Sequence, residues 1–133
     1  YWAQERAVAA DLLARANAPA IADPTTLRDP LYRLFPGDAS VEQRSAAATA
    51  LLRRLSVIAG GPGTGKTTTI ARMLALVDEV EGMHPRRVAL TAPTGKAAAR
   101  LEEAVHEEAA MMEIGDATRA RLLTLAGSTI HRL

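Results

Sequence analysis

The first clear pattern of apolar and polar positions covers residues 1–16. Alanine, valine and leucine recur there at the spacing of one face of an α-helix, and the opposite face is polar. The apolar positions are Ala3, Ala7, Val8, Leu12 and Leu13. An amphipathic helix is therefore expected. Prolines interrupt residues 17–40, which predicts an irregular connection with one turn around residues 31–35.

The next segments predict a helix and then a strand. Ser40 and Gln43 have the spacing of a capping box, in which each side chain bonds the other residue's backbone N–H. A helix is therefore expected over residues 41–54. The short apolar run at residues 56–59 is typical of a strand that is buried on both faces.

Residues 56–92 together predict a strand, a loop, a helix and a second strand. The glycine-rich loop at residues 60–65 lies between the first strand and a helix expected over residues 66–79. A second apolar run follows at residues 87–92. Because such crossovers place both strands in one sheet, the two strands are expected to be parallel neighbours.

Two more helices are expected, over residues 96–112 and 117–126. The acidic run in the first of them is interpreted as a solvated helix face. That run consists of Glu102, Glu103, Glu107 and Glu108. His106, which lies among them, is interpreted as a structural residue rather than part of a site.

Composition narrows the class of protein. Sixteen Lys and Arg against 15 Asp and Glu leave a net charge of +1, so any contact with a polyanion must be local. The absence of cysteine excludes disulfides and Cys-based zinc sites. No apolar run has the length of a membrane span, so a cytoplasmic protein without a membrane partner is expected. The 133 residues suit one modest domain, and a piece of a longer protein is expected.

The strongest chemical signal lies at residues 60–67, which match the phosphate-loop pattern G-x-x-x-x-G-K-[S/T] between a predicted strand and a predicted helix. The motif consists of Gly60, Gly61, Pro62, Gly63, Thr64, Gly65, Lys66 and Thr67. Its glycines allow backbone N–H groups to converge on phosphate oxygens, beside the positive end of the following helix. A nucleotide-binding site is therefore predicted.

Each side chain at the start of the following helix has an expected role. Lys66 is expected to reach the β- and γ-phosphates, and the Thr67 hydroxyl is expected to bind a Mg²⁺ ion that bridges them. Thr68 is placed to add a hydroxyl near the α-phosphate. The motif alone does not choose among kinases, transport ATPases, GTPases and helicases, which all share it.

Four segments, at residues 43–48, 58–69, 92–101 and 128–133, together resemble the first helicase motifs of the RecD family, the alpha subunit of exodeoxyribonuclease V. The resemblance implies an α/β fold, namely the first part of a RecA-like P-loop NTPase domain with parallel strands, preceded by a helical N-terminal segment. The implied domains are 1–16, the end of a helical N-terminal domain; 17–40, a proline-rich linker; and 41–133, an incomplete ATPase domain.

The implied activity is that of a superfamily 1 DNA helicase, which uses ATP and Mg²⁺ to move 5′ to 3′ along single-stranded DNA. Its partners would be RecB-like and RecC-like subunits in double-strand-break repair. The resemblance also implies that the acidic Walker B pair and an arginine finger lie beyond residue 133. The piece alone is therefore expected to be inactive.

The resemblance assigns roles to residues outside the phosphate loop. Gln43 matches a glutamine that contacts the adenine edge, and its capping-box role is an equally weighted alternative. Thr94 and Lys96 match a motif that contacts the DNA backbone, where their side chains are suitable phosphate donors. Thr129 and His131 match a block in which the histidine links DNA contact to the ATP site.

Two other interpretations remain open. A stand-alone RecD-like helicase, or one associated with a relaxase, would share these motifs. A non-helicase P-loop NTPase such as a small-molecule kinase would share only the phosphate loop, and DNA would not stimulate its ATP hydrolysis.

Overall fold

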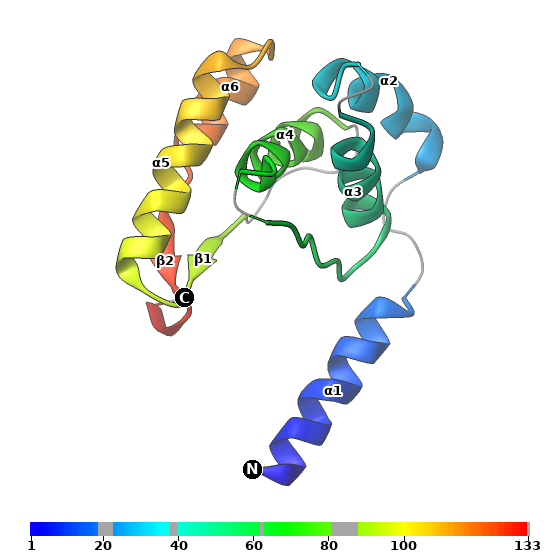
Figure 1. Cartoon of the computed structure of the whole chain (residues 1–133), viewed down its shortest axis with the longest axis vertical. Helices are drawn as coiled ribbons and strands as arrows, with labels where there is room; N and C mark the ends of the chain where they lie inside the picture. Colours follow the sequence, from blue (N-terminus) through cyan, green and yellow to red (C-terminus); the bar gives the residue numbers. More distant parts are fainter. Residues whose placement is uncertain (19–22, 38–39, 62, 81–87, 133) are drawn as a thin grey trace.

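The computed structural model describes residues 1–18, 23–37, 40–61, 63–80 and 88–132. It combines helices with a small parallel sheet that lies beside the helix of residues 95–111 (Figure 1), so the predicted α/β class, with parallel strands after a helical N-terminal segment, is confirmed. In chain order the elements are α1 (Trp2–Ala16), α2 (Pro24–Leu34), α3 (Val41–Leu52), α4 (Lys66–Glu79), β1 (Leu90–Ala92), α5 (Gly95–Met111), α6 (Asp116–Leu122), β2 (Gly127–Thr129) and the 3-10 helix η2 (Ile130–Arg132).

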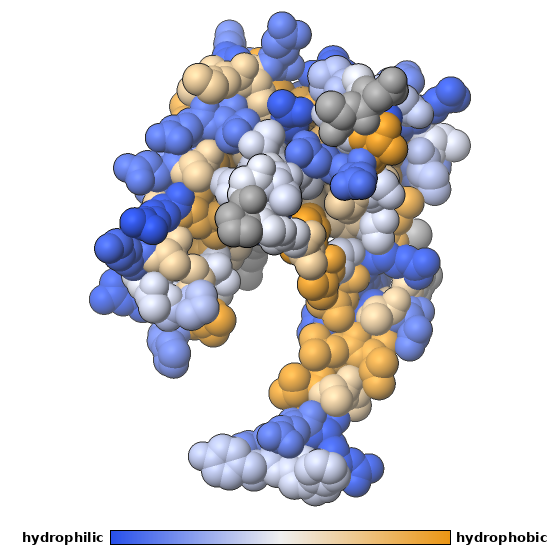
Figure 2. Space-filling model, in the orientation of Figure 1, coloured by the Kyte–Doolittle hydropathy of each residue, from blue (hydrophilic) through white to orange (hydrophobic). Residues whose placement is uncertain are grey.

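Helix α1 forms where it is predicted, but its apolar side packs on nothing in the described part of the chain. None of its residues is buried, and it projects away from the other elements in Figure 1. Val8, Leu12 and Leu13 are exposed, and Figure 2 shows apolar surface on this part of the molecule. The sequence pattern therefore predicted the helix correctly, but the apolar side of this helix does not contribute to the hydrophobic core.

The expected irregular connection over residues 17–40 is wrong, because it contains α2. Asp23 begins this helix by accepting a hydrogen bond from the backbone N–H of Thr25 at 2.9 Å, which lowers the pKa of Asp23. Pro24 occupies the first helical position, where its missing N–H would have had no helical partner. Pro30 removes one internal hydrogen bond. Burial of the apolar face outweighs that loss.

Helix α2 belongs to the core rather than to a linker. Leu27, Leu31 and Leu34 are buried on the face it shares with α3 and α4, and Phe35 after its end is fully buried. Arg44 of α3 donates a hydrogen bond to the Phe35 carbonyl at 2.7 Å. Its guanidinium also lies 4.4 Å from the centre of the Tyr32 ring. These contacts fix α2 on α3.

Helix α3 is confirmed, although it ends two residues before the predicted boundary at residue 54. Ser40 is its N-cap, but its side chain makes no capping hydrogen bond within the described residues. Gln43 instead lies against the phosphate loop. The predicted capping box is therefore wrong, since the loop competes for the amide that the box would use.

The predicted buried strand at residues 56–59 is also wrong. These residues have no strand structure, and the Val57 side chain is 86% exposed. A strand needs a neighbouring backbone that supplies hydrogen bonds. Among the described residues the sheet consists of β1 and β2, which pair in parallel with Leu90 opposite Gly127 and Ala92 opposite Thr129.

Strand β1 is the end of the apolar run predicted at residues 87–92. Its partner β2 was not predicted, because a short Gly-Ser-Thr segment has no alternation of apolar and polar positions. Arg87 lies outside the described residues. The expected pairing of residues 56–59 with residues 87–92 is wrong, because β1 pairs in parallel with β2 instead.

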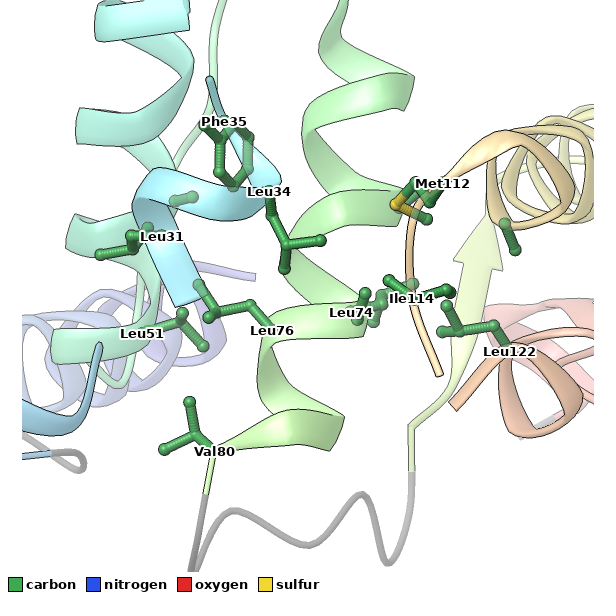
Figure 3. Packing of buried hydrophobic residues seen from close by; sticks show 14 of the residues in the cluster. Leu31, Leu34, Phe35, Leu51, Leu74, Leu76, Val80, Met112, Ile114 and Leu122 are labelled. Atoms are coloured by element: carbon green, nitrogen blue, oxygen red, sulfur yellow. The ribbon is translucent and has the colours of Figure 1, made fainter. Parts of the chain in front are cut away.

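Helix α4 lies in the middle of the hydrophobic core (Figure 3). Its Leu76 faces the side formed by α2 and α3, and its Leu74 faces Met112, Ile114 and Leu122 on the other side. Each such side chain contributes roughly 1.5–3 kcal/mol when it is fully buried. The helix that carries Lys66 and Thr67 is thus anchored on both sides.

Helix α5 lies within one residue of its predicted bounds, whereas α6 ends four residues before the predicted boundary at residue 126. Asp78 of α4 connects α6 to the core, since it accepts hydrogen bonds from Thr118 and Arg121. The hydrogen bond to Asp78 raises the pKa of Arg121. Among the described residues, no helix combines the length and apolar character needed to cross a membrane.

Candidate nucleotide-binding site

The backbone of the phosphate loop has a conformation that requires glycine. Gly63 and Gly65 both have φ of +75°, in the left-handed region that side chains disfavour. A Cβ atom on Gly60 would lie 2.6 Å from the Thr64 hydroxyl oxygen. Glycine at these positions therefore reflects the geometry of the loop, as the sequence predicted. Pro62 lies outside the described residues.

Side chains within the motif hold the loop closed around the Lys66 ammonium. Lys66 Nζ donates to the carbonyl oxygens of Gly60 at 2.6 Å and Gly61 at 2.5 Å. The Thr64 hydroxyl donates to the Gly61 carbonyl at 2.9 Å. A positive charge is thus held at the loop, where an anion would be attracted.

The start of α4 presents backbone donors beside that charge. Its N-cap is Gly65, which has no side chain to accept from the first N–H groups of the helix. The Thr69 hydroxyl and the Thr69 N–H both bond the Gly65 carbonyl, at 2.9 and 2.8 Å. Thr69 is also buried, so packing and these two hydrogen bonds together hold the first turn of α4 in place. The glycine backbone, the helix N-terminus and Lys66 form a donor set that fits a polyphosphate.

Gln43 reaches the loop from α3. Its Nε2 donates to the Thr64 carbonyl at 3.4 Å, and a Cβ atom on Gly65 would lie only 2.5 Å from the same nitrogen. Gln43 and Lys66 both line a pocket of about 150 Å³ between α3 and the loop. The structure therefore places Gln43 beside the predicted nucleotide site.

Thr67 and Thr68 face α5, which sequence reasoning did not connect to the loop. Thr67 lines a recess together with Glu107 and Glu108. The Thr68 hydroxyl donates to Glu108 Oε1 at 2.5 Å. Glu108 is therefore a missed residue at the site. The sequence gives no signal for it, because 40 residues separate it from Thr68.

The solvated-face interpretation of the acidic run is partly wrong. Glu108 bonds Thr68, and Glu102 accepts a hydrogen bond from the backbone N–H of Gly127 at 2.7 Å. Glu103 and Glu107 are exposed as expected. His106 bonds the Leu125 carbonyl at 2.9 Å, which agrees with a structural role.

The four predicted DNA-contacting residues lie at the carboxyl edge of the two-stranded sheet. Thr94 follows β1 and caps α5 by accepting from the Ala97 N–H at 3.2 Å, and exposed Lys96 lies in the first turn of that helix. Thr129 ends β2 directly opposite Ala92, and His131 lies in η2 just beyond it. Parallel pairing thus brings the two motifs to one edge.

Close packing of β2 on α5 maintains this edge. A Cβ atom on Gly127 would lie 2.3 Å from the backbone oxygen of Ala98, which is shorter than any tolerable contact. Only glycine allows this approach. Gly127 is therefore a second residue that sequence reasoning missed.

The phosphate loop and the sheet edge lie at different ends of α5. Thr68 meets this helix at Glu108, near its C-terminus, whereas Lys96 lies in its first turn. The rise of an α-helix separates these two points by about 18 Å along its axis. The structure therefore groups the predicted site residues into two clusters instead of one.

A glycine-rich loop that opens a helix, with a lysine and a threonine at the helix start, is typical of a P-loop nucleotide-binding domain. Residues 43–133 match the family model described as an AAA domain, which is more than half of the chain. The chain therefore belongs to the AAA domain family.

Known proteins narrow this class. The chain is 52% identical over 136 residues to the RecBCD enzyme subunit RecD of Mycobacterium tuberculosis, covering 100% of the chain and 22% of that relative. The RecD subunit of Mycolicibacterium smegmatis is 48% identical over 137 residues, covering 100% of the chain and 23% of the relative. The predicted RecD-family resemblance is confirmed. The chain spans less than a quarter of the length of these two relatives.

A further relative carries a different name. The ATP-dependent RecD2 DNA helicase of Deinococcus radiodurans is 47% identical over 64 residues, which is 48% of the chain and 8% of that protein. The similarity to this helicase thus covers only about half of the chain, whereas that to the mycobacterial RecD subunits covers all of it.

Proposed function

We propose that this chain carries the phosphate-binding part of an ATP-hydrolysing DNA helicase, the RecD-type subunit of a RecBCD-type complex. The observation that carries this proposal is the Lys66 ammonium, held at a glycine loop that opens α4, in a chain 52% identical to a RecD subunit. A polyphosphate suits this donor set better than any neutral ligand does.

The residues that would hold ATP are those of the loop and the first turn of α4. The backbone N–H groups of the loop residues other than Pro62 would surround the phosphates. Lys66 would exchange its two carbonyl contacts for the β- and γ-phosphates. The Thr67 hydroxyl would bind Mg²⁺, and the Thr68 hydroxyl would lie near the α-phosphate. When bound, Mg²⁺ supplies positive charge that stabilises the transferring phosphoryl group.

Gln43 is proposed to recognise the adenine base. Its amide can donate to and accept from the edge of a purine. Support comes from its position on the wall of the loop pocket, beside the Thr64 carbonyl. Recognition of this kind would favour ATP over GTP.

Single-stranded DNA is the proposed ligand of the sheet edge. Thr94, Lys96, Thr129 and His131 carry hydroxyl, ammonium and imidazole groups that suit phosphate oxygens. Support comes from their common position at the carboxyl edge of the sheet, where α/β domains bind ligands. Partners of the RecB and RecC type are supported by the name of the mycobacterial relatives, RecBCD enzyme subunit RecD. Work in the cytoplasm on double-strand breaks is part of the same proposal.

Strand unwinding by the purified full-length protein tests this proposal. We expect ATP-dependent unwinding of a duplex with a 5′ single-stranded tail, little unwinding of one with a 3′ tail, and none by Lys66→Ala. Unwinding that is indifferent to tail polarity would contradict the proposed direction. Unwinding that survives Lys66→Ala would contradict the proposed site.

A stand-alone helicase is the second candidate, favoured by the similarity to the RecD2 helicase of Deinococcus radiodurans. Purification of the tagged protein from its own cells separates the two. Stoichiometric recovery of RecB-like and RecC-like subunits supports the complex, and recovery of the protein alone supports the second candidate.

A further inference from the structure

The Thr68–Glu108 hydrogen bond joins the proposed phosphate site to α5. Thr68 Oγ1 donates to Glu108 Oε1 at 2.5 Å, in a partly buried setting. A hydrogen bond to a carboxylate is about twice as strong as one between neutral groups. A hydroxyl proposed to face nucleotide is thus held by an anionic side chain.

Packing imposes this contact on both partners. Thr69, next to Thr68, is buried and bonds the Gly65 carbonyl, so the first turn of α4 cannot rotate freely. On α5, Val105 and Ala109 are completely buried and fix the rotation of the helix. This rotation of α5 directs the Glu108 side chain toward α4. Glu108 is therefore unlike an exposed carboxylate, which samples many conformations.

We propose that Glu108 limits the affinity of the phosphate loop for nucleotide. Its carboxylate competes with phosphate for the Thr68 hydroxyl, and its negative charge opposes the approach of the phosphates. The inference rests on the proposed function, because it requires phosphates at this loop. A residue that merely supported the fold would have the opposite effect, since its removal would weaken binding.

Equilibrium binding of ATP with Mg²⁺ to the full-length protein, without DNA, tests the proposal. Glu108→Ala is expected to lower the Kd for ATP by about threefold to tenfold, and Glu108→Gln, which removes the charge with little change of shape, by a smaller factor. Glu103→Ala is the matched control, because it removes an exposed carboxylate from the same helix. It should leave the Kd unchanged.

The role of the hydroxyl is tested in a Thr68→Val background. There, Glu108→Ala is expected to tighten ATP binding less than it does in the natural protein, because the hydroxyl is no longer contested. An unchanged or raised Kd in folded Glu108→Gln protein would overturn the proposal, as would an equal gain in both backgrounds. Failure of the proposed function gives a different result, namely ATP binding that Lys66→Ala does not weaken.

Discussion

The phosphate loop and the sheet edge are the two proposed ligand sites, and they are built in different ways. The loop is made within residues 60–69, where glycine dihedral angles and short-range hydrogen bonds fix the donors. The sheet edge exists only because β1 pairs with β2 and β2 packs on α5. A local site follows from its motif, whereas a tertiary site depends on residues far from it in sequence.

The largest expected effect is that of Lys66→Ala on the loop. Loss of the ammonium removes the cation held at the loop, so ATP affinity is expected to fall by about a hundredfold or more. Isothermal titration with ATP and Mg²⁺ measures this. DNA affinity should change little in the same variant, and a parallel loss of DNA binding would show that the two sites are not separate.

The next largest effect concerns the support of the sheet edge. Gly127→Ala introduces a Cβ atom 2.3 Å from the Ala98 oxygen, so β2 or α5 must shift. We expect a loss of about 1–3 kcal/mol in unfolding free energy, measured by chemical denaturation. Gly115→Ala is the matched control, because a Cβ atom there meets nothing within 4 Å. Equal stability of the two variants would contradict the packing described for β2.

Lys96→Ala is expected to have a smaller effect, confined to DNA. Removing one phosphate contact should weaken binding of a single-stranded oligonucleotide by about fivefold to tenfold. It should also reduce the slope of the logarithm of affinity against the logarithm of salt concentration by about one. Fluorescence anisotropy at several salt concentrations measures both. If Lys96→Ala binds nucleotide as tightly as the natural protein does, the sheet edge acts separately from the phosphate loop. An unchanged salt slope would remove Lys96 from the proposed interface.

Gln43→Ala is expected to have the smallest effect. Loss of its amide should reduce the preference for ATP over GTP by about threefold to tenfold and leave the phosphate contacts in place. Competition between the two nucleotides for the full-length protein measures this preference. If the variant keeps full selectivity, the base is recognised elsewhere.

The sequence predicted what is encoded locally. Helix α4 begins and ends where its pattern predicts, because a glycine loop precedes it and its apolar residues keep one period. Two glycines of the loop, Gly63 and Gly65, have the positive φ that glycine permits. In contrast, residues 56–59 do not form the expected strand, and β1 pairs with β2 instead, a pairing that no local pattern reveals.

The remaining errors share the same cause. Pro24 and Pro30 indicated an irregular segment, but the buried face of α2 stabilises the helix in spite of Pro30. Glu108 was interpreted as solvated because its contact with Thr68 depends on the crossing of α4 and α5. Tertiary contacts overrode local preference at each of these places.

The most direct test of the account is ATP hydrolysis by the full-length protein, measured with and without single-stranded DNA and beside Lys66→Ala. The account predicts that DNA stimulates hydrolysis and that Lys66→Ala abolishes both the basal and the stimulated rate. Robust hydrolysis that is indifferent to DNA would contradict it, because the sheet edge would then have no part in the activity of the loop.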